Sequence, residues 1–65
     1  MQQHVLEAID PRVLGQRLQE ARKAIGITQQ DVADSLCLAR TTVTALEKGV
    51  RRIRPDELIQ LSKLY

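Results

Sequence analysis

Apolar residues recur along this chain at spacings of three and four, which is the period of an amphipathic α-helix. The first such stretch follows Asp10 and Pro11, an N-cap residue and a proline at the first helical position. Gly26 then supplies a left-handed residue just past the helix end. The pattern predicts a helix from Pro11 to about residue 25 whose buried face carries Leu14, Leu18, Ala21 and Ile25.

Two shorter helices are predicted next, separated by a turn of about three residues. Thr28 and Asp31 have the spacing of a capping box, and the inner stripe of the second helix is Val32, Ala33 and Leu36. The third helix, from about Ala39 to Lys48, stops at Gly49 and buries Val43 and Leu46, with Leu38 packing from the turn. Isolated helices below about 12–15 residues are marginal in water, so tertiary packing must hold this pair together.

A fourth helix is predicted to open at Pro55, with acidic residues at its positive N-terminal end and an apolar stripe of Leu58, Leu61 and Leu64. In the loop VRRIR before it, Ile53 alone is expected to be buried. No stretch of the sequence has the pattern of a β-strand. We therefore predict an all-α fold, a compact bundle of four or five short helices over residues 10–65, preceded by a flexible N-terminal arm over residues 1–9.

Composition narrows the class of protein. The 65 residues include no Phe or Trp and one Tyr, which disfavours stacking of single-stranded bases on aromatic side chains. A single cysteine allows no internal disulfide or CxxC metal pair, and His4 has no second ligand near it. No stretch reaches about 18 apolar residues, and the N-terminus lacks the pattern of a signal peptide. We expect a cytoplasmic, non-enzymatic protein without metal, cofactor or membrane association.

Charge is unevenly distributed although the net charge is only +2. Residues 40–54, which we call the basic segment, contain one acid, Glu47, and half of the ten Lys and Arg residues: Arg40, Lys48, Arg51, Arg52 and Arg54. A polyanion is the natural partner of such a segment. On its own, however, the segment is equally compatible with a solvated charged surface.

Two consecutive short helices joined by a three- to four-residue turn are the plan of a helix-turn-helix. The run TQQDVADSLCLARTTVTALEKG, residues 28–49, resembles the helix-turn-helix of the phage repressor/Cro-like (XRE) family, and LGQRLQEARKAIGITQ before it resembles that family's first helix. The resemblance covers roughly residues 12–65 and implies a lambda-repressor-like domain that binds double-stranded DNA.

The resemblance implies that the third helix lies in the major groove. Helical spacing places Arg40, Thr41, Thr44 and Lys48 on roughly one outward face. We expect base contacts from Arg40, which suits a bidentate contact to guanine, and from Thr41, Thr44 and Ala45. The alternative for the threonines is a solvated face, but β-branched residues there reduce helix propensity without compensation.

Further residues are assigned to the DNA backbone or to the fold. The expected phosphate contacts are Thr28, Gln29, Thr42, Lys48, Arg51, Arg52 and Arg54. Thr28 also has a structural role as an N-cap, and Arg54 has an alternative role at the start of the fourth helix. Arg22 and Glu47 occupy positions that form an ion pair between the first and third helices in relatives. Without a second carboxylate or a nucleophile and base, Glu47 is not interpreted as catalytic.

Two residues depart from the family pattern. Cys37 stands where the family usually has glycine, in a position where a side chain is penalised by about 1 kcal/mol. We interpret it as a semi-buried structural residue rather than an oxidation sensor. Ala39 replaces the usual Ser or Thr cap of the third helix, and loss of such a cap typically costs about 1 kcal/mol.

The leading hypothesis is a sequence-specific transcriptional regulator, a repressor on family grounds, that binds a two-fold operator as a homodimer. The resemblance also implies a longer parent protein with an additional C-terminal domain. The alternative is a protein-interaction module such as the antitoxin part of a toxin-antitoxin pair, followed by a purely structural bundle.

Overall fold

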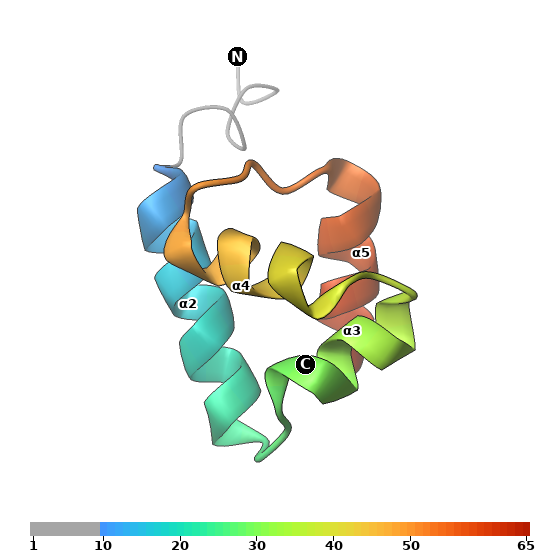
Figure 1. Ribbon diagram of the computed structural model, residues 1–65. Coiled ribbons are helices and arrows are strands. Elements are labelled where there is room, and N and C mark those ends of the chain that lie inside the picture. The colour runs from blue at the N-terminus through green and yellow to red at the C-terminus, as the bar shows by residue number, and fades with distance from the viewer. Residues whose placement is uncertain (1–9) are drawn as a thin grey trace.

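The computed structural model describes residues 10–65 and places four helices in them. These are α2 (Pro11–Ala24), α3 (Gln29–Leu36), α4 (Arg40–Lys48) and α5 (Pro55–Leu64). Residues 10–65 contain no strand, so the all-α prediction is confirmed. The predicted arm over residues 1–9, with His4, lies outside the described residues. Figure 1 shows α3 and α4 joined by a short turn, with α2 and α5 on the two sides of the pair.

The predicted start signals cap the helices as expected. Asp10 Oδ1 accepts the backbone N–H of Arg12 at 2.9 Å, ahead of α2. At α3, Thr28 Oγ1 accepts the N–H of Asp31 at 3.0 Å while Asp31 Oδ2 accepts the N–H of Thr28 at 2.9 Å, which is a complete capping box. Ala39 gives α4 no side-chain cap. The sequence-based predictions of these helix boundaries are therefore confirmed.

Two glycines allow the N-terminal half of α2 to lie directly against the C-terminal end of α4, as Figure 1 shows. A Cβ atom at Gly15 would collide with the backbone carbonyl oxygens of Leu46 and Glu47. Gly49, which ends α4 in the left-handed conformation at φ 75°, lies against the backbone of Arg12. Any side chain at either position would push the two helices apart.

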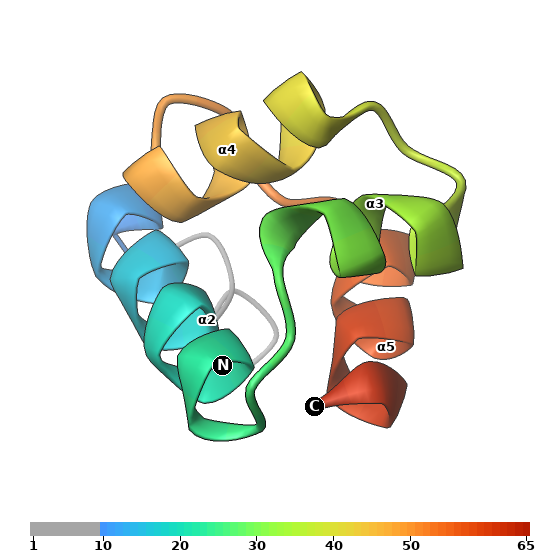
Figure 2. The same ribbon diagram turned by 60° about the horizontal axis from the view of Figure 1, so that its bottom comes forward.

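The hydrophobic core lies where α3, α4 and α5 meet. Its buried side chains are Val32, Ala33, Val43 and Leu61. Partly buried residues from α2, the loops and the C-terminus close around them: Leu18, Ile27, Leu36, Ile53, Leu64 and Tyr65. Figure 2, in which the bottom of the first view comes forward, shows α2 and α5 on opposite sides below α3 and α4.

Two predictions of burial are wrong. Ile25 is 47% exposed, because α2 ends at Ala24 and the following residue leaves the helical period; Ile27 packs against the core in its place. Cys37 is exposed rather than semi-buried, because it occupies the left-handed C-cap of α3 at φ 56° and ψ 42°, outside the packed face of the helix. Leu38, the next residue, is the one that is partly buried.

Candidate nucleic-acid interface

The helix α4 has one packed face and one polar face. Val43, Leu46 and Glu47 are buried against the rest of the domain. Arg40, Thr41 and Lys48 are exposed, and Thr42, Thr44 and Ala45 are partly exposed between them. The residues expected to contact bases therefore lie together along one short helix, with the arginine at its N-terminal end.

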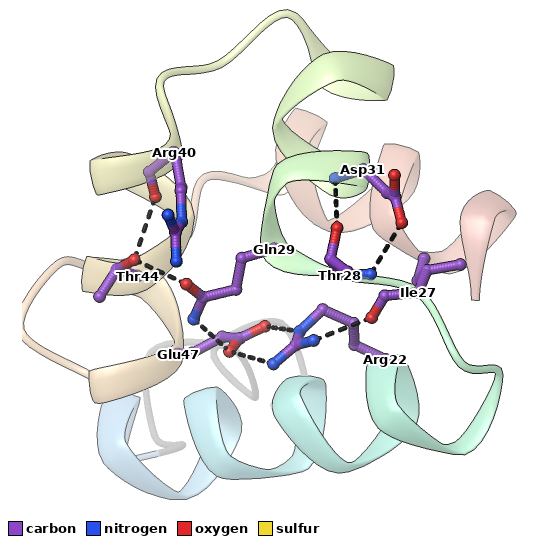
Figure 3. A network of polar contacts seen from close by, with 8 residues as sticks. All are labelled: Arg22, Ile27, Thr28, Gln29, Asp31, Arg40, Thr44 and Glu47. Atoms are coloured by element: carbon purple, nitrogen blue, oxygen red, sulfur yellow. Dashed lines mark hydrogen bonds and ion pairs between the residues drawn. The ribbon is translucent and has the colours of Figure 1, made fainter.

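A buried ion pair anchors α4 to α2. Arg22 Nε donates to Glu47 Oε2 at 2.7 Å and Arg22 Nη2 donates to Glu47 Oε1 at 3.2 Å, and the two side chains are only 9% and 3% exposed. Arg22 Nη1 also donates to the carbonyl oxygen of Ile27 at 2.9 Å. The hydrogen bond from Arg22 to Glu47 raises the pKa of the guanidinium above its usual value. This pair, shown in Figure 3, links α2, α4 and the α2–α3 loop through one charged group.

Gln29, the first residue of α3, extends this network to the polar face of α4. Its side-chain nitrogen Nε2 donates to Glu47 Oε1 at 2.9 Å, and its Oε1 accepts the hydroxyl of Thr44 at 2.9 Å. The Thr44 hydroxyl also lies 3.2 Å from the backbone carbonyl oxygen of Arg40 (Figure 3). The start of α3 is thus tied by side chains to the middle of α4, which fixes how the two helices meet.

An open hollow of about 460 Å³ lies at the N-terminus of α3. Its lining consists of Arg22, Thr28, Gln29, Gln30 and Arg40. The first N–H groups of a helix and its positive dipole end favour an anion, and the exposed arginine at the start of α4 adds positive charge. The structure therefore brings together Thr28, Gln29 and Arg40, three of the residues assigned to DNA from the sequence.

The arginines of the α4–α5 loop lie beyond the other end of α4. Arg51 donates to both carboxylate oxygens of Glu57, from Nη1 and Nη2, at 2.9 Å each. Glu57 Oε1 also accepts the backbone N–H of Arg54 at 2.9 Å, and this carboxylate is 4% exposed. The side chain of Arg54 lies 3.4 Å from Asp56, whereas Arg52 is exposed and forms no ion pair within residues 10–65.

The hydrogen bond from Arg51 is the main cause that holds the pKa of Glu57 below its ordinary value, and the N–H of Arg54 adds to it. The carboxylate in turn raises the pKa of Arg51. Glu57 thus fastens the α4–α5 loop to the first turn of α5, and it neutralises part of the positive charge of the basic segment.

Comparison with known proteins agrees with this geometry. A family model described as "Helix-turn-helix" matches residues 18–65, which is 48 of the 65 residues. The chain belongs to the helix-turn-helix family. The HTH-type transcriptional regulator ImmR of Bacillus subtilis (strain 168) is 38% identical over 52 residues. The resemblance to the phage repressor/Cro-like (XRE) type is confirmed by these matches.

The alignment with ImmR covers 80% of this helix-turn-helix chain and 41% of the relative. The chain therefore spans about two fifths of the length of that regulator. No solved structure matches the chain.

Sequence reasoning missed two parts of the interface. The hydrogen bond between Gln29 and Thr44 joins side chains on separate helices, and no residue spacing along the chain predicts it. Glu57 had a local signal: an acidic residue three positions after the N-cap, following Pro55, is the pattern in which a side chain returns to the N-cap backbone. This pattern predicts the hydrogen bond from the Arg54 N–H to Glu57, but it does not predict the ion pair between Glu57 and Arg51.

Within residues 10–65, no group of three or more His, Cys, Asp or Glu side chains is arranged to hold a metal ion. Nor does any helix in that range have both the length and the apolar character that crossing a membrane requires.

Proposed function

We propose that this domain is the DNA-binding part of a sequence-specific transcriptional regulator and that α4 enters the major groove of its operator. The observation that carries the proposal is the polar face of α4, which is fixed to α3 through Gln29 and Thr44 and to α2 through Glu47. A rigidly mounted helix with an exposed arginine at its N-terminal end suits the major groove, which is about 12 Å wide and admits an α-helix.

Base contacts are assigned to the outward residues of α4. Arg40 suits a bidentate hydrogen bond to guanine O6 and N7, the commonest specific contact of an arginine. Thr41 is exposed beside it, and Thr44 and Ala45 are partly exposed one turn later. Ala45 offers only apolar contact, for example to a thymine methyl group.

Phosphate contacts are assigned to both ends of α4. Thr28 and Gln29 border the hollow at the start of α3, and Thr42 and Lys48 belong to α4 itself. Arg51, Arg52 and Arg54 lie in the loop after it. Among these three, Arg52 is the strongest candidate, because Glu57 already neutralises much of the charge of Arg51, and Arg54 lies beside Asp56.

The regulator is proposed to act as a repressor and as a homodimer on a two-fold operator. In this arrangement each protomer places one α4 in a half-site, and the half-sites are about one helical turn, roughly 34–36 Å, apart. ImmR is named a transcriptional regulator, which supports the same class of activity for this domain.

Selection of random duplex DNA by the purified protein tests the proposal. We expect enrichment of a palindrome by the unchanged chain and by Arg17→Ala, which removes an exposed arginine from α2. Arg40→Ala should lose preference at one base pair per half-site and bind the operator more weakly by about 1–3 kcal/mol per protomer. If Arg40→Ala selects the same palindrome with equal affinity, the proposed role of α4 is wrong. Loss of a protein partner in that variant would favour the antitoxin-like alternative.

A further inference from the structure

Figure 3 shows a hydrogen-bond network that begins at the buried ion pair of Arg22 and Glu47, and this pair determines which neighbouring groups donate and which accept. The Glu47 carboxylate, which accepts two bonds from Arg22, is an acceptor only. The Gln29 group that faces Glu47 Oε1 at 2.9 Å must therefore be the amide nitrogen, Nε2. The orientation of the Gln29 amide is thus set by a buried ion pair rather than by solvent.

With its nitrogen turned to Glu47, Gln29 presents its oxygen to Thr44. A carbonyl oxygen only accepts, so the bond of 2.9 Å between Thr44 Oγ1 and Gln29 Oε1 requires the Thr44 hydroxyl to donate. The second neighbour of this hydroxyl, the backbone carbonyl oxygen of Arg40 at 3.2 Å, is also an acceptor. A hydroxyl has one proton, and both of its partners inside the protein compete for it.

We infer that Thr44 reads DNA as a hydrogen-bond acceptor and through its methyl group, and that Gln29 is the positioning residue that imposes this polarity. The inference rests on the proposed function of α4. An acceptor in the major groove is satisfied by the exocyclic amines, N6 of adenine or N4 of cytosine. The same hydroxyl does not donate to the purine N7, to guanine O6 or to thymine O4 while its proton is held by Gln29.

The test begins with the operator selected by the unchanged protein. Thr44→Val keeps the shape and one methyl group but removes the hydroxyl, so the base pair whose preference it changes is the pair that Thr44 reads. At this pair, the amine is removed with purine in place of adenine or 2-pyrimidinone in place of cytosine. In separate duplexes, the purine N7 is replaced by carbon with a 7-deazapurine. Binding of each duplex is then measured for every variant.

We expect amine removal to weaken binding of the unchanged protein by about threefold to tenfold, the range of one net hydrogen bond. Binding of Thr44→Val should be insensitive to that change, and the 7-deazapurine should have no effect on the unchanged protein. Gln29→Ala leaves only the more distant carbonyl oxygen of Arg40, at 3.2 Å, to hold the proton, so the hydroxyl can turn to DNA and this variant should acquire a loss of affinity with the 7-deazapurine. Gln60→Ala, the same change at an exposed glutamine of α5, should behave as the unchanged protein.

Three results would overturn the inference. The first is a loss of affinity of the unchanged protein on the 7-deazapurine duplex, which would mean that the hydroxyl donates. The second is an unchanged preference of Thr44→Val at every base pair. The third is a Gln29→Ala variant that keeps the polarity of the unchanged protein. In each case selection that still depends on Arg40 leaves the proposed function intact, whereas failure to select any sequence removes both.

Discussion

At the residue scale, the Arg22–Glu47 pair is the buried ion pair that joins α2 to α4. Both side chains are buried, so each desolvated charge depends on the other. A domain of this size is expected to have a free energy of unfolding of only about 3–10 kcal/mol. Removing one partner from a buried pair costs about 3–5 kcal/mol, because the remaining charge has no compensation.

We therefore expect Arg22→Ala and Glu47→Ala each to be largely unfolded or severely destabilised in urea titrations. The double variant Arg22→Met with Glu47→Leu removes both charges and fills their space with apolar atoms. It should be more stable than either single variant. If the double variant loses the sum of the two single effects, the pair is not an interdependent unit.

The second buried carboxylate, Glu57, predicts how stability depends on pH. Its pKa in the folded domain is lowered from the ordinary value of 4.5 by the hydrogen bond from Arg51 and the N–H of Arg54. A lowered pKa means that the stabilisation is present above about pH 4.5 and is lost as the pH falls through the folded-state value. Asp10 and Asp31 also have lowered pKa values and act in the same direction.

Glu57→Gln should therefore be less stable than the unchanged domain at pH 7 and should lose less further stability between pH 7 and pH 3. Urea midpoints at several pH values measure this difference. Glu20→Gln is the matched control, because Glu20 is exposed and forms no ion pair within the described residues. If Glu57→Gln loses as much stability between pH 7 and pH 3 as Glu20→Gln does, Glu57 is not a source of the acid sensitivity.

At the scale of the element, the turn between α3 and α4 stores conformational strain. Cys37 is the one non-glycine residue with positive φ in residues 10–65, and that conformation costs a side chain about 1–2 kcal/mol. Cys37→Gly should stabilise the domain by about 1 kcal/mol and raise its Tm by roughly 4–8 °C, measured in reductant. Cys37→Ser keeps the Cβ atom and should bring no such gain. An equal gain from both variants would point to the thiol and not to the backbone.

How far the sequence predicts this fold also depends on scale. Caps such as Thr28 and stops such as Gly49 act within one helical turn, so their residue types identify the boundaries directly. The prediction for Ile25 is wrong because the apolar spacing continues one residue past the end of α2. The network between Gln29, Thr44 and Glu47 depends on how separate helices cross, and local spacing carries no information on that geometry. The residues on the outward face of α4 follow from helical spacing. The direction of the hydrogen bond from the Thr44 hydroxyl to Gln29 does not.

At the scale of the whole molecule, the distribution of charge matters more than the net charge of +2. One cationic region surrounds Arg40 and the N-terminus of α3, and another occupies the loop after α4. Nine helical residues at about 1.5 Å each separate them by about 13 Å, so they suit phosphates on either side of the stretch of DNA that α4 is proposed to contact. The ion pair between Arg51 and Glu57 reduces the positive charge that the second region presents to a phosphate.

Neighbouring arginines should therefore behave differently on DNA. Arg52→Ala removes an exposed charge, so it should weaken binding to all sequences alike. It should also flatten the plot of log affinity against log salt by about one unit per bound protomer, with no change in Tm. Arg51→Ala should instead lower Tm, because it leaves the buried carboxylate of Glu57 without its main partner. Its salt slope should change less than that of Arg52→Ala. If the two variants have equal Tm values and change the salt slope equally, the ion pair with Glu57 does not keep Arg51 from contacting DNA.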